Sequence, residues 1–523
     1  MKRIAFTLSF FSLCLLLTAQ NDEAEIRATI QDFIDGTTYN YQDQIRGAYY
    51  PEALLFLHNG TDTAFHVSPD QYAGYFRRPP GTVNNRVSTV LGLDIALDIA
   101  YAKVQVDVPS ISRRYYDMLL LKKIRGEWLI IAKATSAEPM PLARENAYLR
   151  LDKQVVLGDL NRPRSMAFLS EYEVLITEKD GTLLRANLSD STRTPITGLP
   201  TDVARPILID TAKHEWGVYP PSAHGQTHSF NAGWLEVLLD PDFANNQLIY
   251  LSYVSMRQDQ SATTKVIRGR LEGSVLSQVE TLLVAEPYSH GLFHFGGGMV
   301  FGPDGKLYIT IGERNLFEHH NPELPLAQDL TDRRGKIYRI NPDGSIPEDN
   351  PDFGPEAVPG LFATGIRAAQ GLTLRPGTEQ IWFSEHGTHQ GDELNLLRAG
   401  ANYGWPYQTT GSYRSQDYNP AVPEDLVFTE PAFYWTHTVA PTGLQFYPGG
   451  RSFPEWTGNL LVPGLSRGSL WRFTLEGDEI VGAEELFVND RLRLRKVAVS
   501  PAGRIYLLTD YEQGVVLEVI RRE

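Results

Sequence analysis

Hydrophobic positions in the first part of the chain change from a helical period to a strand period. From Ile26 to Ile34, apolar residues recur at the three- and four-residue spacing of one helix face. Ser68-Pro69 then predicts the start of a second short helix, with the serine as its cap. Between Ala100 and Val108 every second residue is apolar, and two further apolar runs flank the turn Arg125-Gly126. Residues 21–138 are therefore predicted to form a small α+β unit with helices first and antiparallel strands later.

A different pattern, a repeated pair of short apolar strands, begins at about residue 151. Six copies of the pair occur at roughly 50–75-residue spacing, most of them with a proline or glycine turn between the strands. They begin near Met166, Val237, Met299, Leu372, Leu444 and Val497. One such hairpin cannot bury both of its faces, whereas radial packing of several sheets can. Residues 151–523 are therefore predicted to form an all-β six-bladed β-propeller with four strands in each blade.

Residues 1–20 have the features of a signal peptide rather than of a folded segment. Two basic residues precede an apolar run from Ile4 to Leu17, and Thr18-Ala19-Gln20 provides a small-residue cleavage point. The run is too short to span a membrane comfortably, and no second apolar segment of membrane length follows. The only cysteine, Cys14, lies inside this run. The mature chain is thus expected in the periplasm or secreted, with neither thiols nor disulfides.

Composition and charge narrow the function classes. A formal net charge of -15 argues against nucleic-acid binding, which needs a clustered basic face. A hydrophobic content of 42%, with 44 glycines and 33 prolines, fits a globular, turn-rich, β-heavy protein. Pro139 and Pro141 indicate a linker over residues 139–150 between the two predicted units.

Three arginines concentrate positive charge in one short segment of this acidic chain. Arg491, Arg493 and Arg495 alternate with leucines, so in an extended strand all three side chains share one face. Their guanidinium groups repel each other unless an anion, from the protein or from a ligand, lies against them. The pattern therefore predicts an anion-binding site; the alternative is a solvated strand edge with surface ion pairs.

Candidate chemistry also lies next to several of the repeated strands. His294 is flanked by phenylalanines and followed by three glycines, Gly296 to Gly298, which indicates close approach of a ligand to the backbone. The alternative is a packed histidine in a glycine-rich turn. Arg367 precedes the fourth copy, and a polar loop from Glu385 to Glu393 follows it. In a propeller such loops converge at one end of the central channel.

Over about residues 158–520 the chain resembles the soluble pyrroloquinoline-quinone (PQQ)-dependent glucose and aldose-sugar dehydrogenases, the glucose/sorbosone dehydrogenase family. The motifs that carry this resemblance are Asn161-Arg162-Pro163, Leu239-Asp240-Pro241-Asp242-Phe243, Ala327-Gln328-Asp329-Leu330, Gly335-Lys336, Asn341 to Pro351, Glu385-His386-Gly387, Gly391-Asp392-Glu393 and Asn402-Tyr403-Gly404-Trp405-Pro406. Residues 21–138 resemble the cone-shaped nuclear-transport-factor-2-like (NTF2-like) fold through Tyr39-Asn40-Tyr41, Tyr49 to Leu54 and Gly126-Glu127-Trp128.

The resemblance implies specific roles for residues of this chain. Arg367, Arg493 and Arg495 correspond to positions that bind PQQ, a tricarboxylate quinone. His294 corresponds to the general base, which takes the proton of the sugar hydroxyl while hydride passes to the quinone. A calcium ion that polarises the quinone is held in the family by two main-chain carbonyls, which correspond to Gly387 and Thr388.

The chain departs from the family pattern at several cofactor contacts. Asn231 replaces a glutamine, and Phe293 replaces an acidic or amide residue before the histidine. Ala368 replaces an asparagine, and Ser466 replaces a lysine beside a retained Arg467. Asn231 and Arg467 remain candidate cofactor-binding residues.

Two functions therefore stay open from the sequence. One is a PQQ- and calcium-dependent sugar dehydrogenase that takes a small sugar and passes electrons to an external acceptor. The other is a non-catalytic propeller that has lost PQQ and binds a glycan or a protein. The N-terminal unit has no acid–base pair that stands out, so it is interpreted as a binding or dimerisation module, which allows for a homodimer.

Overall fold

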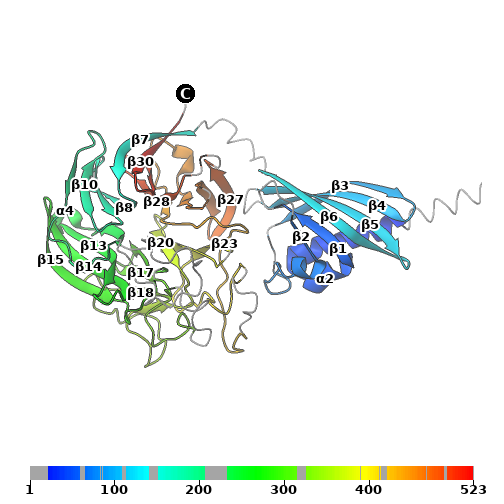
Figure 1. Cartoon of the computed structure of the whole chain (residues 1–523), viewed down its shortest axis with the longest axis horizontal. Helices are drawn as coiled ribbons and strands as arrows, with labels where there is room; N and C mark the ends of the chain where they lie inside the picture. Colours follow the sequence, from blue (N-terminus) through cyan, green and yellow to red (C-terminus); the bar gives the residue numbers. More distant parts are fainter. Residues whose placement is uncertain are drawn as a thin grey trace, which may run out of the picture. The chain divides into compact units, whose positions relative to one another are not determined.

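The computed structural model forms two compact units, Met1–Ala147 and Tyr148–Glu523. Figure 1 shows the two units, coloured along the sequence. The structure describes residues 22–58, 65–82, 84, 86–108, 113–139, 151–205, 233–291, 293–314, 325–388, 390–411, 413, 421–466, 468–487, 490 and 492–521.

The N-terminal unit begins with helices and continues into one six-stranded sheet. Its helices cover residues 22–39, Gln42–Ala48 (α2) and Pro69–Ala73 (α3). The sheet has the order β2-β1-β6-β5-β4-β3, with β1 Tyr49–Leu57, β2 Phe65–Val67, β3 Val87–Ala96, β4 Ile99–Val108, β5 Arg113–Ile124 and β6 Glu127–Pro139. Ser68 caps α3, as the sequence predicted, by accepting a hydrogen bond from Gln71 N at 3.2 Å. The short helix α2 was not predicted.

The core of this unit lies between the helices and the sheet. The residues predicted to form one helix face, including Ile26, Ile30 and Phe33, are buried there. An ion pair is buried with them: Lys133 Nζ lies 3.0 Å from Asp117 Oδ2, and both side chains are 2% exposed. Lys133 also donates to the hydroxyl of Tyr72 at 2.8 Å.

The second unit consists of six four-stranded antiparallel sheets. The first two sheets are β8 Pro163–Phe168, β9 Glu173–Glu178, β10 Leu183–Asn187 and β11 Arg193–Pro195, and then β12 Trp234–Leu239, β13 Leu248–Met256, β14 Ala262–Glu272 and β15 Val275–Val284. The next two are β16 Gly296–Phe301, β17 Leu307–Ile311, β18 Lys336–Ile340 and β19 Leu361–Ala363, and then β20 Ala369–Leu374, β21 Ile381–Glu385, β22 Glu393–Leu396 and β23 Phe433–Tyr434. The last two are β24 Gln445–Phe446, β25 Leu460–Pro463, β26 Leu470–Glu476 and β27 Glu479–Leu486, and then β28 Leu494–Val499, β29 Ile505–Thr509, β30 Gly514–Arg521 and β7 Leu151–Leu160. Two short helical turns, α4 Phe243–Asn246 and Pro454–Trp456, join strands. Each copy of the sequence repeat falls on the first two strands of one sheet.

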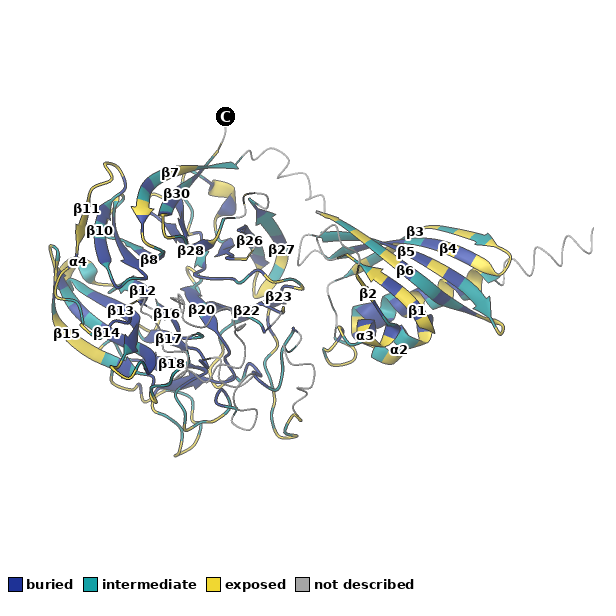
Figure 2. Cartoon of the chain, in the orientation of Figure 1, coloured by how far each residue is buried: buried dark blue, intermediate teal, exposed yellow. Residues whose placement is uncertain are grey.

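The first strands of the sheets contact one another in a continuous series. The contacts run from β8 through β12, β16, β20 and β24 to β28, and β28 contacts β8 in turn. Most residues of these first strands are themselves buried (Figure 2), because neighbouring sheets cover both of their faces. The last sheet combines the two ends of the unit, since β30 pairs with β7.

The prediction of a mostly β protein with a small α+β unit before it is confirmed. Within the described part of the chain, no helix has the length and apolar character needed to cross a membrane. Strand β6 ends at Pro139, so the first residue of the predicted linker is still part of the sheet.

Candidate functional site

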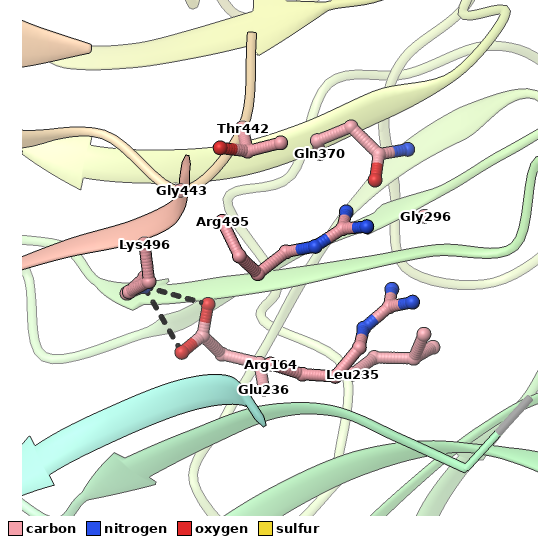
Figure 3. Close-up of a pocket in the computed structure, with 9 residues that line it drawn as sticks. All are labelled: Arg164, Leu235, Glu236, Gly296, Gln370, Thr442, Gly443, Arg495 and Lys496. Carbon is pink, nitrogen blue, oxygen red and sulfur yellow. Dashed lines mark hydrogen bonds and ion pairs between the residues drawn. The ribbon is translucent and has the colours of Figure 1, made fainter. Parts of the chain in front are cut away.

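One pocket collects residues from the beginning of all six first strands. It is lined by Arg164, Leu235, Glu236, Gly296, Gln370, Thr442, Gly443, Arg495 and Lys496 (Figure 3). These residues lie at or next to the starts of β8, β12, β16, β20, β24 and β28. The starts of the first strands therefore meet at one end of the unit. His294 and Arg367 each lie two residues before such a start.

His294 has a carboxylate partner that the sequence did not reveal. In the antiparallel pair of β16 and β17, Gly296 is opposite Ile311. His294 lies two residues before Gly296, and Glu313 lies two residues after Ile311. Because the strands are antiparallel, the hairpin brings these two side chains together. Glu313 Oε1 lies 2.6 Å from His294 Nδ1. Phe293, the neighbour in sequence, cannot orient the imidazole, but Glu313 does so across the hairpin.

The electrostatics of this pair keep the imidazole neutral. Burial, and then the positive charge of Arg367, lower the pKa of His294 to about 4, although Glu313 acts in the opposite direction. A carboxylate only accepts hydrogen bonds, so a neutral His294 donates its Nδ1 proton to Glu313 and keeps a lone pair on Nε2. This is the protonation state that a general base requires.

Arg367 is a buried cation fixed at several points. Its Nη1 donates to the carbonyl of His386 at 3.1 Å, and its guanidinium lies 5.1 Å from the centre of the Trp405 ring. Its own carbonyl accepts from Glu313 N at 2.9 Å, which connects the arginine to the partner of His294. Its backbone N–H donates to the carboxyl group of Glu385. The cation, the carboxylate and the imidazole thus form one connected group.

A pair of acidic side chains lies behind Arg367. Glu385 and Glu393 are cross-strand neighbours on β21 and β22. Burial, and then the charge of Glu393, raise the pKa of Glu385 to about 8. Burial likewise raises the pKa of Glu393 to about 7. The pair therefore holds a proton at neutral pH, because two charged carboxylates this close repel each other.

The loop after β21 is organised by Asp392. Its carboxylate accepts from the backbone N–H groups of Gly387 at 2.9 Å and of Val439 and Ala440, both at 2.7 Å. A Cβ on Gly387 would lie 2.1 Å from the carbonyl oxygen of Gln390, so only glycine fits this fold of the loop. His386 Nε2 lies 2.9 Å from the carbonyl oxygen of Pro441. The backbone that carries Gly387 and Thr388 is thereby held in place.

The described residues contain no group of three or more His, Cys, Asp or Glu side chains that can hold a metal. Main-chain carbonyls at Gly387 and Thr388 are a different kind of ligand, and calcium accepts them readily.

Arg493 and Arg495 lie on the same side of the strand, as alternation requires, and share one carboxylate. Asp510 Oδ2 accepts from Arg493 Nη2 at 3.1 Å and from Arg495 Nη2 at 2.6 Å. Burial alone would raise the pKa of Asp510, but the charges of Arg495 and Arg164 hold it well below its usual range. The chain itself thus supplies one anion for this cluster. Arg495 is 9% exposed in its side chain, whereas Arg493 is 46% exposed.

The two groups of predicted residues are electrostatically connected. Burial lowers the pKa of His386 to about 4, and the positive charges of Arg495 and Arg367 contribute to this shift. Among the other predicted residues, Asn231, Arg467 and Arg491 lie outside the described part of the chain.

The glycines after His294 allow close packing of protein atoms, whereas their pattern in the sequence suggested close approach of a ligand. A Cβ on Gly297 would lie 2.5 Å from Leu235 Cδ1 in the neighbouring sheet. A Cβ on Gly296 would lie 2.7 Å from Gly312 N in the paired strand. Protein atoms fill the space of the missing side chains, so these glycines allow close packing of strands; only Gly296 also lines the pocket.

Comparison with known proteins gives two family matches. Residues 160–518 match the family described as Glucose / Sorbosone dehydrogenase, and residues 21–136 match one described as Putative lumazine-binding. Aldose sugar dehydrogenase YliI of Escherichia coli is 33% identical over 377 residues, which cover 71% of this chain and 92% of that protein. Quinoprotein glucose dehydrogenase B of Acinetobacter calcoaceticus is 28% identical over 434 residues, covering 69% and 85%. The structure of the PQQ-bound aldose sugar dehydrogenase of Streptomyces coelicolor matches with 25% identity and a TM-score of 0.53, over 71% of this chain and 99% of its own.

Proposed function

The chain belongs to the glucose/sorbosone dehydrogenase family, and from this premise we propose that residues 151–523 oxidise a sugar hydroxyl with PQQ and calcium, converting an aldose to its lactone. The observation that carries the proposal is the pair of His294 and Glu313, 2.6 Å apart, in contact with the buried cation Arg367 through the backbone. A neutral imidazole beside a fixed cation suits removal of a proton from a bound hydroxyl.

The six sheets are best interpreted as the blades of a closed six-bladed propeller. The continuous series of contacts from β8 to β28 and back to β8 supports this interpretation. In such a ring the loops around one end of the axis converge, which brings together residues about two hundred positions apart in sequence. That end carries His294, Arg367 and Arg495.

The charges of the site fit a tricarboxylate quinone. Arg495 Nε is buried and has no hydrogen-bond partner among the described residues, so it offers a donor to an incoming carboxylate. Arg367, Arg493 and Arg495 would hold the carboxylates, with Asn231 and Arg467 as further candidate contacts. Carbonyls of Gly387 and Thr388 would hold the calcium ion, on the loop that Asp392 fixes. When bound, the quinone supplies the acceptor for the hydride.

The roles of the chain's own residues follow from their contacts. Nε2 of His294 accepts the proton of the sugar hydroxyl. As positive charge develops on the imidazole, the carboxylate of Glu313 stabilises it across a buried hydrogen bond. Arg367 opposes that charge in the free protein but is screened once an anion lies against it. Glu313 is therefore a positioning and charge-stabilising residue for His294.

The proposal also includes the location of the protein in the cell and the role of its N-terminal unit. Export to the periplasm or outside the cell follows from the expected signal peptide, and an external electron acceptor would then reoxidise the quinone. The N-terminal unit would serve as a binding or dimerisation module.

The alternative is a propeller that has lost PQQ and binds a glycan or protein. Two substitutions favour it: Ala368 is fully buried, without a polar group, and Ser466 is exposed where the resemblance implies a lysine. The two functions are separated by adding PQQ and excess calcium to purified full-length protein and recording the absorbance of bound quinone.

Two variants separate cofactor binding from catalysis. Arg495→Ala should weaken PQQ binding by about 1.5–3 kcal/mol, the range for a charged hydrogen bond. His294→Gln should leave binding nearly intact and lower turnover about 10²- to 10⁴-fold. Absence of PQQ binding to the wild-type protein at micromolar cofactor would reject the dehydrogenase in favour of the non-catalytic propeller.

A further inference from the structure

Arg164, which lines the same pocket as Arg495, is a buried cation whose charge Asp510 and Glu236 offset only in part. It lies at the second position of β8 and is 6% exposed. Its Nε and Nη1 have no hydrogen-bond partner among the described residues. Buried guanidinium groups normally have their donors satisfied, because each unpaired donor has lost its water. Arg164 therefore has unused capacity to bind an anion.

Neighbouring positive charges add to the cost of burying the charge of Arg164. Burial, and then the positive charge of Arg495, lower the pKa of Arg164 to about 9. Burial and the charge of Arg164 also lower the pKa of Lys179 to about 7. The carboxylate of Asp510 already accepts hydrogen bonds from Arg495 and Arg493. The cluster thus contains more buried positive charge than Asp510 can offset.

The carboxylate that lines the pocket, that of Glu236, already pairs with Lys496. Both oxygens of Glu236 accept from Lys496 Nζ, at 3.0 and 2.8 Å, and Ser165 Oγ donates to the same group. In Figure 3 the guanidinium groups of Arg164 and Arg495 extend to the same side of the pocket, away from the pair of Lys496 and Glu236. Gly296 also lines the pocket, on the side to which the two guanidinium groups extend.

We propose that Arg164 and Arg495 together form a carboxylate-binding site at the axis of the ring, and that this site takes one carboxylate of the quinone cofactor. The inference rests on the proposed function for the identity of the ligand. Two planar guanidinium groups facing one carboxylate can donate to both of its oxygens.

The test uses the full-length protein, with calcium, and compares two arginines two residues apart. Arg164→Gln removes the pocket cation. Arg162→Gln is the matched control, because Arg162 pairs at 2.6 Å with Glu512, which is 77% exposed, and does not line the pocket. PQQ affinity from absorbance and calorimetric titration should fall about 10- to 100-fold in Arg164→Gln and less than about threefold in Arg162→Gln.

A second readout separates ligand binding from a structural role. Without PQQ, Arg164→Gln should be at least as stable to heat as the wild type, because it removes an unmatched buried charge. With saturating PQQ, it should gain less thermal stabilisation than the wild type. A cofactor-free Arg164→Gln protein that melts several degrees below the wild type would overturn the inference, since Arg164 would then be a structural ion-pair partner.

The remaining outcomes distinguish this inference from the proposed function. If the wild type binds PQQ and Arg164→Gln binds it equally well, the inference is wrong and the dehydrogenase stands. If the wild type does not bind PQQ, the proposed function fails, and malonate serves as the probe of the site. Thermal stabilisation of the wild type by malonate that is lost in Arg164→Gln, but not in Arg162→Gln, would support a carboxylate site; no stabilisation would overturn it.

Discussion

Replacing Glu313 by glutamine tests whether His294 is the base and whether the hairpin positions it. The glutamine keeps the size of the side chain and an oxygen that can accept the Nδ1 proton, but it removes the negative charge. The expected effect is on turnover, because that charge matters most when the imidazole becomes positive.

The magnitude follows from the geometry of the pair. The 2.6 Å contact joins side chains that are 14% and 2% exposed, so water screens the interaction little. A hydrogen bond to a charged group contributes about 1.5–3 kcal/mol. Lost from the transition state alone, this corresponds to a decrease in kcat of about 10- to 150-fold, with PQQ affinity and KM nearly unchanged.

Steady-state kinetics with PQQ, calcium and an aldose provide the assay. Glu512→Gln is the control, because it removes a carboxylate that is 77% exposed and lies outside the site. NMR gives an independent readout: the Nδ1 proton of His294 should be protected in the wild type and exchange faster in Glu313→Gln. The pKa of His294 should also fall further, since Glu313 acts to raise it. An unchanged kcat in Glu313→Gln, alongside a large loss in His294→Gln, would refute the assigned role of the carboxylate.

Three further predictions follow from buried charges and from the two units. The raised pKa values of Glu385 (about 8) and Glu393 (about 7) mean that the folded protein retains a proton that the unfolded chain releases near pH 4.5. Stability should therefore fall as pH rises from about 4.5 to 8, and Glu393→Gln should reduce this slope in thermal melts recorded across that range. Asp117→Asn should destabilise the N-terminal unit by about 3–5 kcal/mol, because it leaves the charge of Lys133 buried without a counter-charge; adding Lys133→Met should restore much of the loss in denaturant melts. Cleavage near residue 145 should yield two folded fragments by circular dichroism, because each unit has its own core, and an insoluble 151–523 fragment would contradict this separation.

The repeat could be predicted from the sequence because its signal is local. Each copy combines alternating or continuous apolar residues with a turn, and together these define a hairpin without reference to the rest of the chain. The outer strands are harder to recognise, since β11, β19 and β23 have only two or three residues each. The helix α2 was missed for a similar reason: its seven residues contain only two buried ones, Ile45 and Ala48.

The sequence identifies a residue of the site only where a recognisable motif surrounds that residue. His294, Arg367 and Arg495 have motifs around them. Glu313 has none, but it could have been found by extending the register of its hairpin outward to the residue opposite His294. Arg164 and Asp510 could not be found in this way, because they meet through the radial arrangement of different strands. That arrangement depends on packing between sheets rather than on any short segment.

The pairing of β7 with β30 has a consequence for how the chain is made. The strand that opens the second unit remains without its sheet partner until the final strand emerges, roughly 360 residues later. Closing a loop of that length costs about 5 kcal/mol of chain entropy, so incomplete chains should not hold the ring shut. A chain that loses its last ten residues lacks the partner strand of β7, so it exposes unpaired strand edges on both sides of the gap.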